Sequence, residues 1–208
     1  IINTYEWTIT DAGLAPECIN NWNGSVSNDW FDSRNWSLGT PNSDSDLMMI
    51  NQVNLPELED ASVVNSLTIN IDASLSSTVS DAALTINNDL ENNGTMSMSS
   101  STSVIVKGSS SGEIAYNRNF PSTNWYLVSS PVQGQQYDNT YVAANELASN
   151  GSNKAIASYV SSNNSWDYLQ EGETKTFDLG IGLSMRKATV TGNVSFTGTI
   201  NVNDAGVA

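Results

Sequence analysis

Residues 66–106 read SLTINIDASLSSTVSDAALTINNDLENNGTMSMSSSTSVIV, and this stretch decides the fold. In its first part, apolar and polar side chains alternate strictly, the apolar ones being Leu67, Ile69, Ile71, Ala73 and Leu75. Side chains of a β-strand point alternately to opposite faces, so this pattern predicts strands buried on one face only.

The same stretch also repeats itself. Ser66-Leu67-Thr68-Ile69 is echoed by Asp89-Leu90-Glu91-Asn92, Ala73-Ser74-Leu75-Ser76 by Met96-Ser97-Met98-Ser99, and Ala83-Leu84-Thr85-Ile86 by Ser103-Val104-Ile105-Val106. The offsets lie near 20 to 23 residues, and Asn, Gly or Ser separates the short strands. This pattern is typical of a parallel β-helix whose coils stack their inward Leu, Ile, Val and Met residues. An antiparallel meander with coincidental spacing is the alternative. We expect a short right-handed β-helix of two coils.

Upstream, residues 20–50 are rich in turns and contain Trp22, Trp30 and Trp36. The first coil of a β-helix exposes a hydrophobic end that has to be covered. We therefore predict that the three Trp residues form an N-terminal cap, the alternative being a ligand cage. The expected organisation is a connector or the end of a preceding module at 1–19, a capped β-helix at 20–112, and a different unit from 113 onwards.

From Glu113 the predicted strands become longer and more aromatic. They are expected at 114–116, 125–128, 155–160, 166–169, 174–179, 183–187 and 194–197, with a hairpin loop at 161–164. The one helical turn is expected near Ala143–Leu147. Residues 113–208 are therefore predicted to form an antiparallel β-sandwich, incomplete within this segment, which makes the whole chain all-β.

The composition excludes several classes of protein. The chain has 31 Ser and 27 Asn residues, no His, and a net charge of -15 with only seven Lys plus Arg. Strong negative charge without a basic stripe argues against nucleic-acid binding, and no apolar run is long enough for membrane insertion. Because 38% of the residues are hydrophobic and many of them alternate with polar residues, the chain is expected to fold rather than to be disordered. Cys18 is the single cysteine, so no internal disulfide framework is expected.

A resemblance extends over residues 20–202. It is carried by the order of short motifs: Trp22-Asn23-Gly24-Ser25, Asp29-Trp30, Asn35-Trp36, Gly39-Thr40-Pro41, Asp44-Ser45-Asp46, Ser66-Leu67-Thr68-Ile69, Asn92-Asn93-Gly94-Thr95, Ile114-Ala115-Tyr116-Asn117-Arg118, Trp125 to Val132, Gly180-Ile181-Gly182 and Phe196-Thr197-Gly198. The chain resembles β-helical modules of large secreted or cell-surface proteins of the Bacteroidetes, which are exported by type IX secretion. Relatives have an aromatic residue after Gly180-Ile181-Gly182, where this chain has Leu183, and the C-terminal sorting domain is absent from this segment.

Catalysis finds little support in these residues. Without His, a Ser-His-Asp triad and a His metal site are impossible, and Cys18 lacks a His partner. Paired carboxylates such as Asp44 with Asp46, or Asp72 with Asp89, are the remaining route, but two coils are too few to build a substrate groove. We expect a protein that is not an enzyme and that has no cofactor other than calcium.

Calcium is the one metal that the sequence offers a site for. Asp44 and Asp46 lie on a turn, and carboxylate oxygens suit Ca²⁺. In the alternative, which the pattern favours, Asp46 caps the turn by accepting backbone hydrogen bonds and Asp44 is solvated.

Carbohydrate binding is the other candidate activity. Trp166 and Tyr168 share one strand face beside the loop containing Asn163 and Asn164, and aromatic rings can stack on sugars. In the alternative, this face points into the core of the sandwich.

Two functions follow as expectations. The first is a non-catalytic structural or adhesive module of a larger secreted or cell-surface protein, outside a Gram-negative cell. Its expected partners are other modules of the same polypeptide, export machinery and surface polysaccharide. The second is a carbohydrate-binding module that accompanies a polysaccharide-degrading enzyme.

Overall fold

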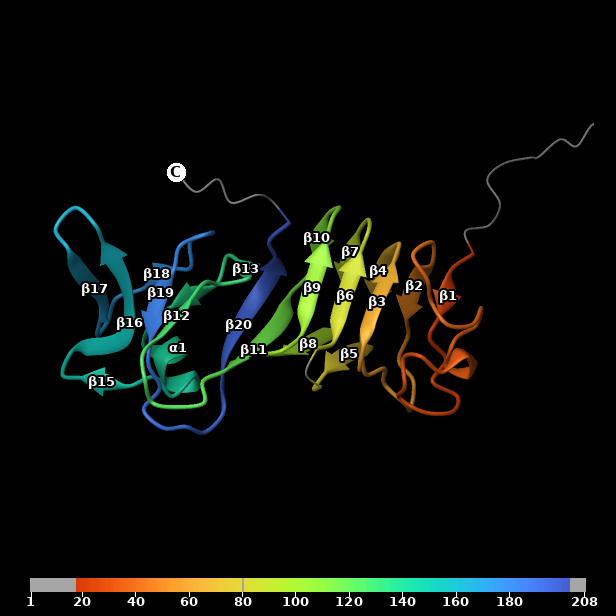
Figure 1. Cartoon of the computed structure of the whole chain (residues 1–208), viewed down its shortest axis with the longest axis horizontal. Helices are drawn as coiled ribbons and strands as arrows, with labels where there is room; N and C mark the ends of the chain where they lie inside the picture. The colour runs from red at the N-terminus through yellow and green to blue at the C-terminus, as the bar shows by residue number, and fades with distance from the viewer. Residues whose placement is uncertain (1–17, 80, 203–208) are drawn as a thin grey trace, which may run out of the picture.

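The structure is a computed structural model that describes residues 18–79 and 81–202. It confirms the all-β prediction and combines a solenoid of parallel coils with antiparallel sheets. The two parts lie one after the other along the long axis of the molecule (Figure 1), with the first described strand at one end and the β16–β17 hairpin at the other. Most of the connector or preceding module expected at 1–19 lies outside the described residues.

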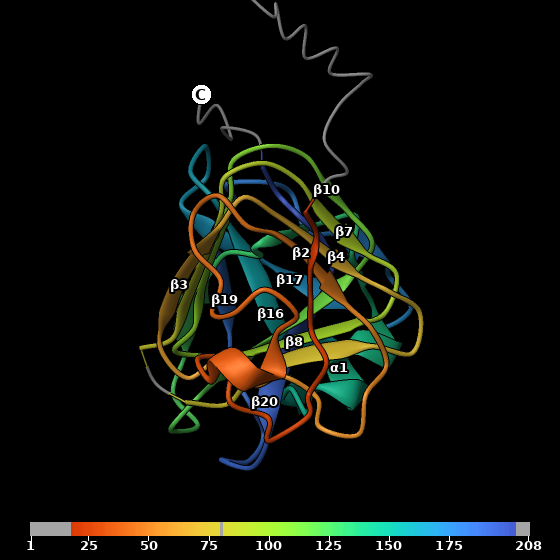
Figure 2. The ribbon, with the colours of Figure 1, turned by 90° about the vertical axis from the view of Figure 1, so that its right-hand side faces the viewer.

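The solenoid has three complete coils of three strands each, one more coil than the sequence predicted. The coils are β3 (Ala61–Val64), β4 (Ser66–Ile69) and β5 (Ser74–Ser77), then β6 (Ala83–Ile86), β7 (Leu90–Asn92) and β8 (Thr95–Ser99), then β9 (Ser103–Val106), β10 (Ser110–Ser111) and β11 (Ile114–Asn119). Each strand pairs in parallel with the strand one coil away, which gives the three faces visible in the view along the stack (Figure 2). The third coil was missed because Ile114–Tyr116 was assigned to the sandwich.

The stacking register confirms two of the three predicted alignments. Leu67 pairs with Leu90 and Leu84 pairs with Val104, as expected. Leu75, however, pairs with Met96 and not with Met98. The reason is the corner before the third face: residues 70–73 connect β4 to β5, but only Asn93 and Gly94 connect β7 to β8. Because this corner has two residues fewer in the second coil, the sequence offset between paired residues is shorter by two on the third face than on the second. An even change keeps the same side of the strand facing the interior.

Apolar ladders fill the interior of the coils. The fully buried side chains include Leu67, Ile69, Leu75, Leu84 and Ile86, each with an apolar residue in register on at least one neighbouring strand. Burial of one such side chain contributes about 1.5–3 kcal/mol, so the stack is held mainly by its interior. At one corner, the Asn88 amide donates to Asn65 Oδ1 and the Asn65 amide to Asp46 Oδ1, each at 2.8 Å, so polar side chains also form a ladder.

The three tryptophans form the predicted cap. The cap consists of β1 (Asn20–Asn21), the 3₁₀ turn η1 (Ser33–Asn35) and β2 (Asp46–Met49), and β1 and β2 extend the sheet of β4. Trp22 and Trp30 are fully buried, and each meets the Trp36 ring edge to face, with centroids 5.1 and 5.0 Å apart. Each indole N–H has an acceptor, and the buried Asn35 side chain accepts from the backbone of Val26 and Ser27.

The antiparallel part begins where the solenoid ends. One sheet runs β13 (Val132–Gln133), β20 (Asn193–Ile200), β11, β8 and β5, so β11 pairs with β20 on one edge and with β8 on the other. A second sheet contains β12 (Tyr126–Val128), β19 (Leu183–Met185), β16 (Asn153–Val160) and β15 (Ser149–Asn150), with β17 (Ser165–Gln170) paired to β16. A small sheet joins β14 (Gln136–Tyr137) to β18 (Lys175–Thr176).

Aromatic residues form the core of this part. Val194, Phe196 and Ile200 point inward from β20, as the sequence predicted, and Phe196 packs on Phe177 at 5.4 Å. The strand expected at 174–179 shrinks to the two residues of β18. The short helix α1 (Asn139–Ala144) starts earlier than expected, because the Asp138 side chain accepts from the Tyr141 backbone N–H and caps it.

A buried lysine fixes the loop that leads into β20. Lys187 is almost fully buried, its ammonium donates to the carbonyl of Thr191, and it lies 3.4 Å from the Glu146 carboxylate. Hydrogen bonds from Thr191, together with Lys187, hold the pKa of Glu146 below its usual value. Lys187 and Glu146 therefore hold this loop against the chain that follows α1, and both charged groups have partners.

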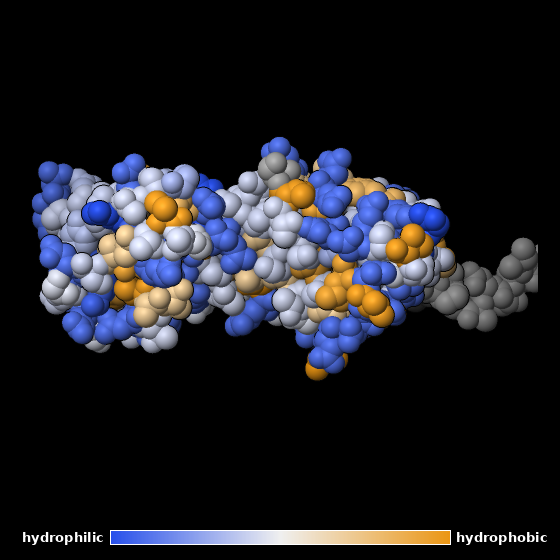
Figure 3. Space-filling view, turned by 90° about the horizontal axis from the view of Figure 1, so that it is seen from below, coloured by the Kyte–Doolittle hydropathy of each residue, from blue (hydrophilic) through white to orange (hydrophobic). Residues whose placement is uncertain are grey.

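The surface is mostly hydrophilic, with small separate apolar areas on the face shown in Figure 3. Most of the large apolar side chains belong to the continuous core that runs from the cap into the antiparallel part.

The cap makes a direct prediction about stability. Trp36→Ala should lower the free energy of unfolding by about 3–5 kcal/mol, because it removes the ring that contacts both other tryptophans. Urea denaturation at neutral pH measures the change. Leu38→Ala, at an exposed position two residues away, should change it by less than about 0.5 kcal/mol. Equal effects of the two substitutions would contradict the cap.

Glu146 makes a prediction about pH. Its folded-state pKa is lowered, so its contribution to stability is present above the usual value of 4.5 and is lost as the pH falls below it. The unfolding midpoint of Glu146→Gln should therefore lie below that of the wild type at pH 7, and the gap should narrow towards pH 3. Thermal unfolding monitored by circular dichroism measures both proteins. Glu59→Gln, at an exposed position, is the control and should lower the midpoint at pH 7 less than Glu146→Gln does.

Candidate functional site

Trp166 and Tyr168 lie on the outward face of the second antiparallel sheet. Trp166 pairs with Tyr159 and Tyr168 with Ala157 across the β16–β17 hairpin, so these four side chains share one face. Leu169, on the opposite face of β17, is fully buried in the core. Trp166 is 42% exposed and Tyr159 49% exposed. The predicted pair of aromatics therefore faces solvent and not the sandwich core.

Each predicted ring has an aromatic neighbour that the sequence reasoning missed. Trp166 meets Tyr159 edge to face at 5.3 Å, and Tyr168 meets Trp125 in the same manner at 5.9 Å. Trp125 precedes β12 and is 44% exposed. Tyr159 could have been found from the sequence, because a four-residue loop at 161–164 brings it opposite Trp166. Trp125 comes from a distant segment, and no local signal places it here.

Polar groups surround the free end of the hairpin. The Tyr159 hydroxyl donates to Asn164 Oδ1, and the Ser165 hydroxyl donates to Asn163 Oδ1 at 2.8 Å. Asn164 has a positive φ of 55°, which Asn tolerates better than most residues. The loop thus fixes the orientation of the Tyr159 ring. We call the group of Trp125, Tyr159, Trp166 and Tyr168 the aromatic face.

A cavity of about 280 Å³ adjoins the aromatic face at Trp125 and Tyr168. Its remaining lining comes from Ala148, Ser149, Asn150, Asn153, Lys154, Ala155 and Arg186. It thus combines aromatic rings, amides and two cations. Such a set can stack on a small ring and hydrogen-bond its substituents.

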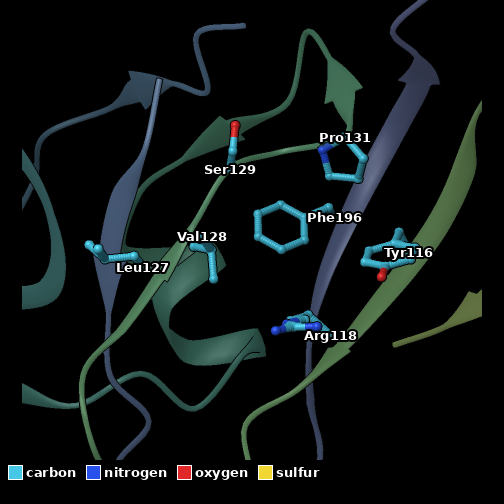
Figure 4. A pocket seen from close by; sticks show the side chains of 7 residues that line it. All are labelled: Tyr116, Arg118, Leu127, Val128, Ser129, Pro131 and Phe196. Atoms are coloured by element: carbon cyan, nitrogen blue, oxygen red, sulfur yellow. The ribbon is translucent and has the colours of Figure 1, made fainter. Parts of the chain in front are cut away.

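A second cavity, of about 320 Å³, lies at the junction between the solenoid and the antiparallel part (Figure 4). Tyr116 and Arg118 line it from β11, and Val128 lines it from β12. The Tyr116 hydroxyl and the Arg118 guanidinium are both engaged with Ser100. No carboxylate, thiol or amide side chain lines this cavity, so it offers fewer polar groups to a ligand than the first cavity does.

Asp44 and Asp46 do not lie in an acidic cluster. Asp46 belongs to β2 and accepts from the Asn65 amide, while Asp44 is exposed. Asn42 and not Asp46 holds the preceding turn, through its bonds with Ser45 and with the Asp44 backbone N–H. Within residues 18–79 and 81–202, no group of three or more His, Cys, Asp or Glu side chains is placed to hold a metal ion. Calcium binding by Asp44 and Asp46 stays a prediction.

The carboxyl groups with shifted pKa values have local structural causes. A backbone and a side-chain hydrogen bond from Ser109 lower the pKa of Asp89, and hydrogen bonds from Arg34 lower that of Asp32. Neither residue, nor Glu146, lines the two cavities described above. Cys18 is exposed, and its thiol has no disulfide partner.

None of the helices in the described part of the chain has the length and apolar character needed to cross a membrane.

Comparison with known proteins identifies a family but no function. No curated protein and no solved structure matches the chain. One family model does match, a domain of unknown function (DUF8693), over residues 21–206. The match begins in the Trp cap and runs through the coils and the antiparallel part. The chain therefore belongs to the family of the domain of unknown function DUF8693.

Proposed function

We propose that this chain is a non-catalytic structural and adhesive module of a larger secreted or cell-surface protein. In this role the solenoid acts as a stiff spacer, and the aromatic face at its far end contacts polysaccharide. The observation that carries the proposal is a group of four neighbouring aromatic rings at the outward face of this sheet, of which Trp125, Tyr159 and Trp166 are exposed and Tyr168 is half-buried.

The physical argument for adhesion rests on the cost of exposing these rings. A free-standing fold gains stability by burying large aromatics, and this chain buries Trp22, Trp30 and Trp36 in its cap. Trp125 and Trp166 are left 44% and 42% exposed instead. Exposed aromatics that lie together mark binding surfaces, and Trp and Tyr dominate the energetics of such surfaces.

The location of the parent protein is part of the same proposal. The order of motifs from Trp22 to Gly198 supports an extracellular or outer-surface protein of the Bacteroidetes, exported by type IX secretion. A hydroxyl- and amide-rich surface with a charge of -15 is well hydrated, which suits an exposed module. The proposed partners are other modules of the same polypeptide, the export machinery and surface polysaccharide.

A carbohydrate-binding module that accompanies a polysaccharide-degrading enzyme is the second candidate. It uses the same aromatic face and differs in what the rest of the parent protein does. Incubation of the intact parent with a bound polysaccharide separates the two candidates, since release of reducing sugars supports the second and its absence supports the first.

Loss of the Trp166 ring tests the adhesive role. Trp166→Ala should weaken retention on immobilised polysaccharide about thirty-fold, as expected when about 2 kcal/mol of contact energy is removed. Affinity electrophoresis through gels that contain different polysaccharides measures the retention. Ile105→Ala, which removes an exposed apolar side chain from the solenoid, is the matched control and should leave retention unchanged.

Thermal unfolding of both variants completes the test. The midpoint of Trp166→Ala should stay close to that of the wild type, because the ring is half exposed. If no polysaccharide retards the wild type and Trp166→Ala instead lowers the midpoint strongly, the adhesive role is wrong and the ring is structural.

A further inference from the structure

We propose that the cavity beside Trp125 binds a carboxylate-bearing sugar residue, a uronic acid within a polysaccharide. This inference rests on the proposed function and adds to it the chemical class of the ligand and a second contact point, Arg186.

The first observation concerns which of the Lys and Arg side chains have a partner. The chain has seven basic residues, and two of them, Lys154 and Arg186, line this one cavity. Lys154 lies 3.9 Å from the Glu171 carboxylate. Arg186 differs from it, because within residues 18–79 and 81–202 its guanidinium has neither a salt bridge nor a hydrogen bond. The other five basic residues each have a side-chain partner: Arg34 with Asp32, Lys107 with Asn87, Arg118 with Ser100, Lys175 with Asp167 and Lys187 with Glu146.

Arg186 is exposed, so its guanidinium is accessible, and no carboxylate of the described residues pairs with it. Acidic residues outnumber basic ones by 22 to 7, so a cation has many available carboxylates. An arginine that is left unpaired beside two aromatic rings is therefore available for an anion from outside the chain.

The second observation is that the backbone holds Arg186 in place. Its N–H donates to the Ala155 carbonyl at 3.1 Å, and its carbonyl accepts from the Ala148 N–H at 3.0 Å. Ala148 and Ala155 also line the cavity. The preceding residue, Met185, is fully buried between Tyr126 and Ile156, which anchors this end of β19 in the core. The backbone of Arg186 is therefore held rigidly beside the cavity.

The third observation is the arrangement of the rings. Trp125 and Tyr168 meet at an interplanar angle of 65°, so together they form a corner and not a single flat platform. The cavity, at about 280 Å³, lies just below the usual size range for ligand sites, so it has room for one small ring. One sugar ring can stack against one wall while Asn150 and Asn153 supply amides for its hydroxyl groups.

These three observations together select the ligand. A neutral sugar needs rings and amides but no unpaired cation, and a cationic amino sugar would be repelled. A carboxylate, in contrast, matches the planar guanidinium in a two-point contact. The remainder of the polysaccharide would extend from this corner across the aromatic face towards Trp166.

Short oligosaccharides provide the test. Trimers of galacturonic, glucuronic and mannuronic acid are titrated into the intact chain in 0.15 M NaCl and followed by calorimetry. We expect at least one trimer to bind, and its neutral methyl ester, which keeps the same rings, to bind at least tenfold more weakly. Arg186→Gln should weaken binding of the acid at least tenfold and that of the ester less than twofold. Arg118→Gln removes the same charge at the junction cavity and should change binding of the acid less than twofold.

Each result decides between the claims. Equal binding of acid and ester, or no effect of Arg186→Gln, overturns the uronic-acid site. Failure of all three acids also overturns it, and if a neutral polysaccharide is still retained through Trp166, the proposed adhesive function stands. If neither acidic nor neutral polysaccharide is retained, both proposals are wrong.

Discussion

The pairing of β11 on both of its edges determines how the rest of the molecule is built. On one edge β11 continues the parallel stack through β8, and on the other it pairs antiparallel with the long strand β20. An unpaired strand at the end of a solenoid presents free N–H and C=O groups to other chains. The antiparallel part saturates this edge, and it is held to the coils by backbone hydrogen bonds as well as by side-chain packing. The family match across both parts fits a single structural unit.

The two ends of the solenoid are closed by different means. At the N-terminal end, three indoles cover the open hydrophobic interior and their N–H groups bond to nearby oxygens. At the other end, β20 pairs with β11 on one face of the last coil, and Val194, Phe196 and Ile200 complete the interior. Because both ends are closed, the aromatic rings of the far sheet are not required as a cover, and they are free to face solvent.

Much of the solenoid could be predicted from the sequence, since its information is local and periodic. Alternation correctly placed Leu67, Ile69 and Leu75 inward, and the echo of Leu67 in Leu90 identified the stack. It was wrong for Ile71, which is 74% exposed because it lies in the corner between β4 and β5. The pairing of Leu75 was wrong because it depends on how many residues a corner holds, which alternation does not report. The start of α1 was misplaced because Asp138, its cap, was not weighed. In the candidate site, Trp166 and Tyr168 were recognised on one strand. Trp125 and Arg186 were not, because only the tertiary fold brings those distant segments together.

The stacked coils have a consequence for how such proteins diversify. Each coil contacts only the coils directly before and after it, and neighbouring strands in a sheet lie about 4.8 Å apart. Duplication of one coil between β5 and β9 would leave the cap and the β11–β20 pairing unchanged. It would lengthen the molecule by one strand spacing and move the aromatic face outward by the same step. Descendants of such a protein can therefore change how far they reach without altering what they contact.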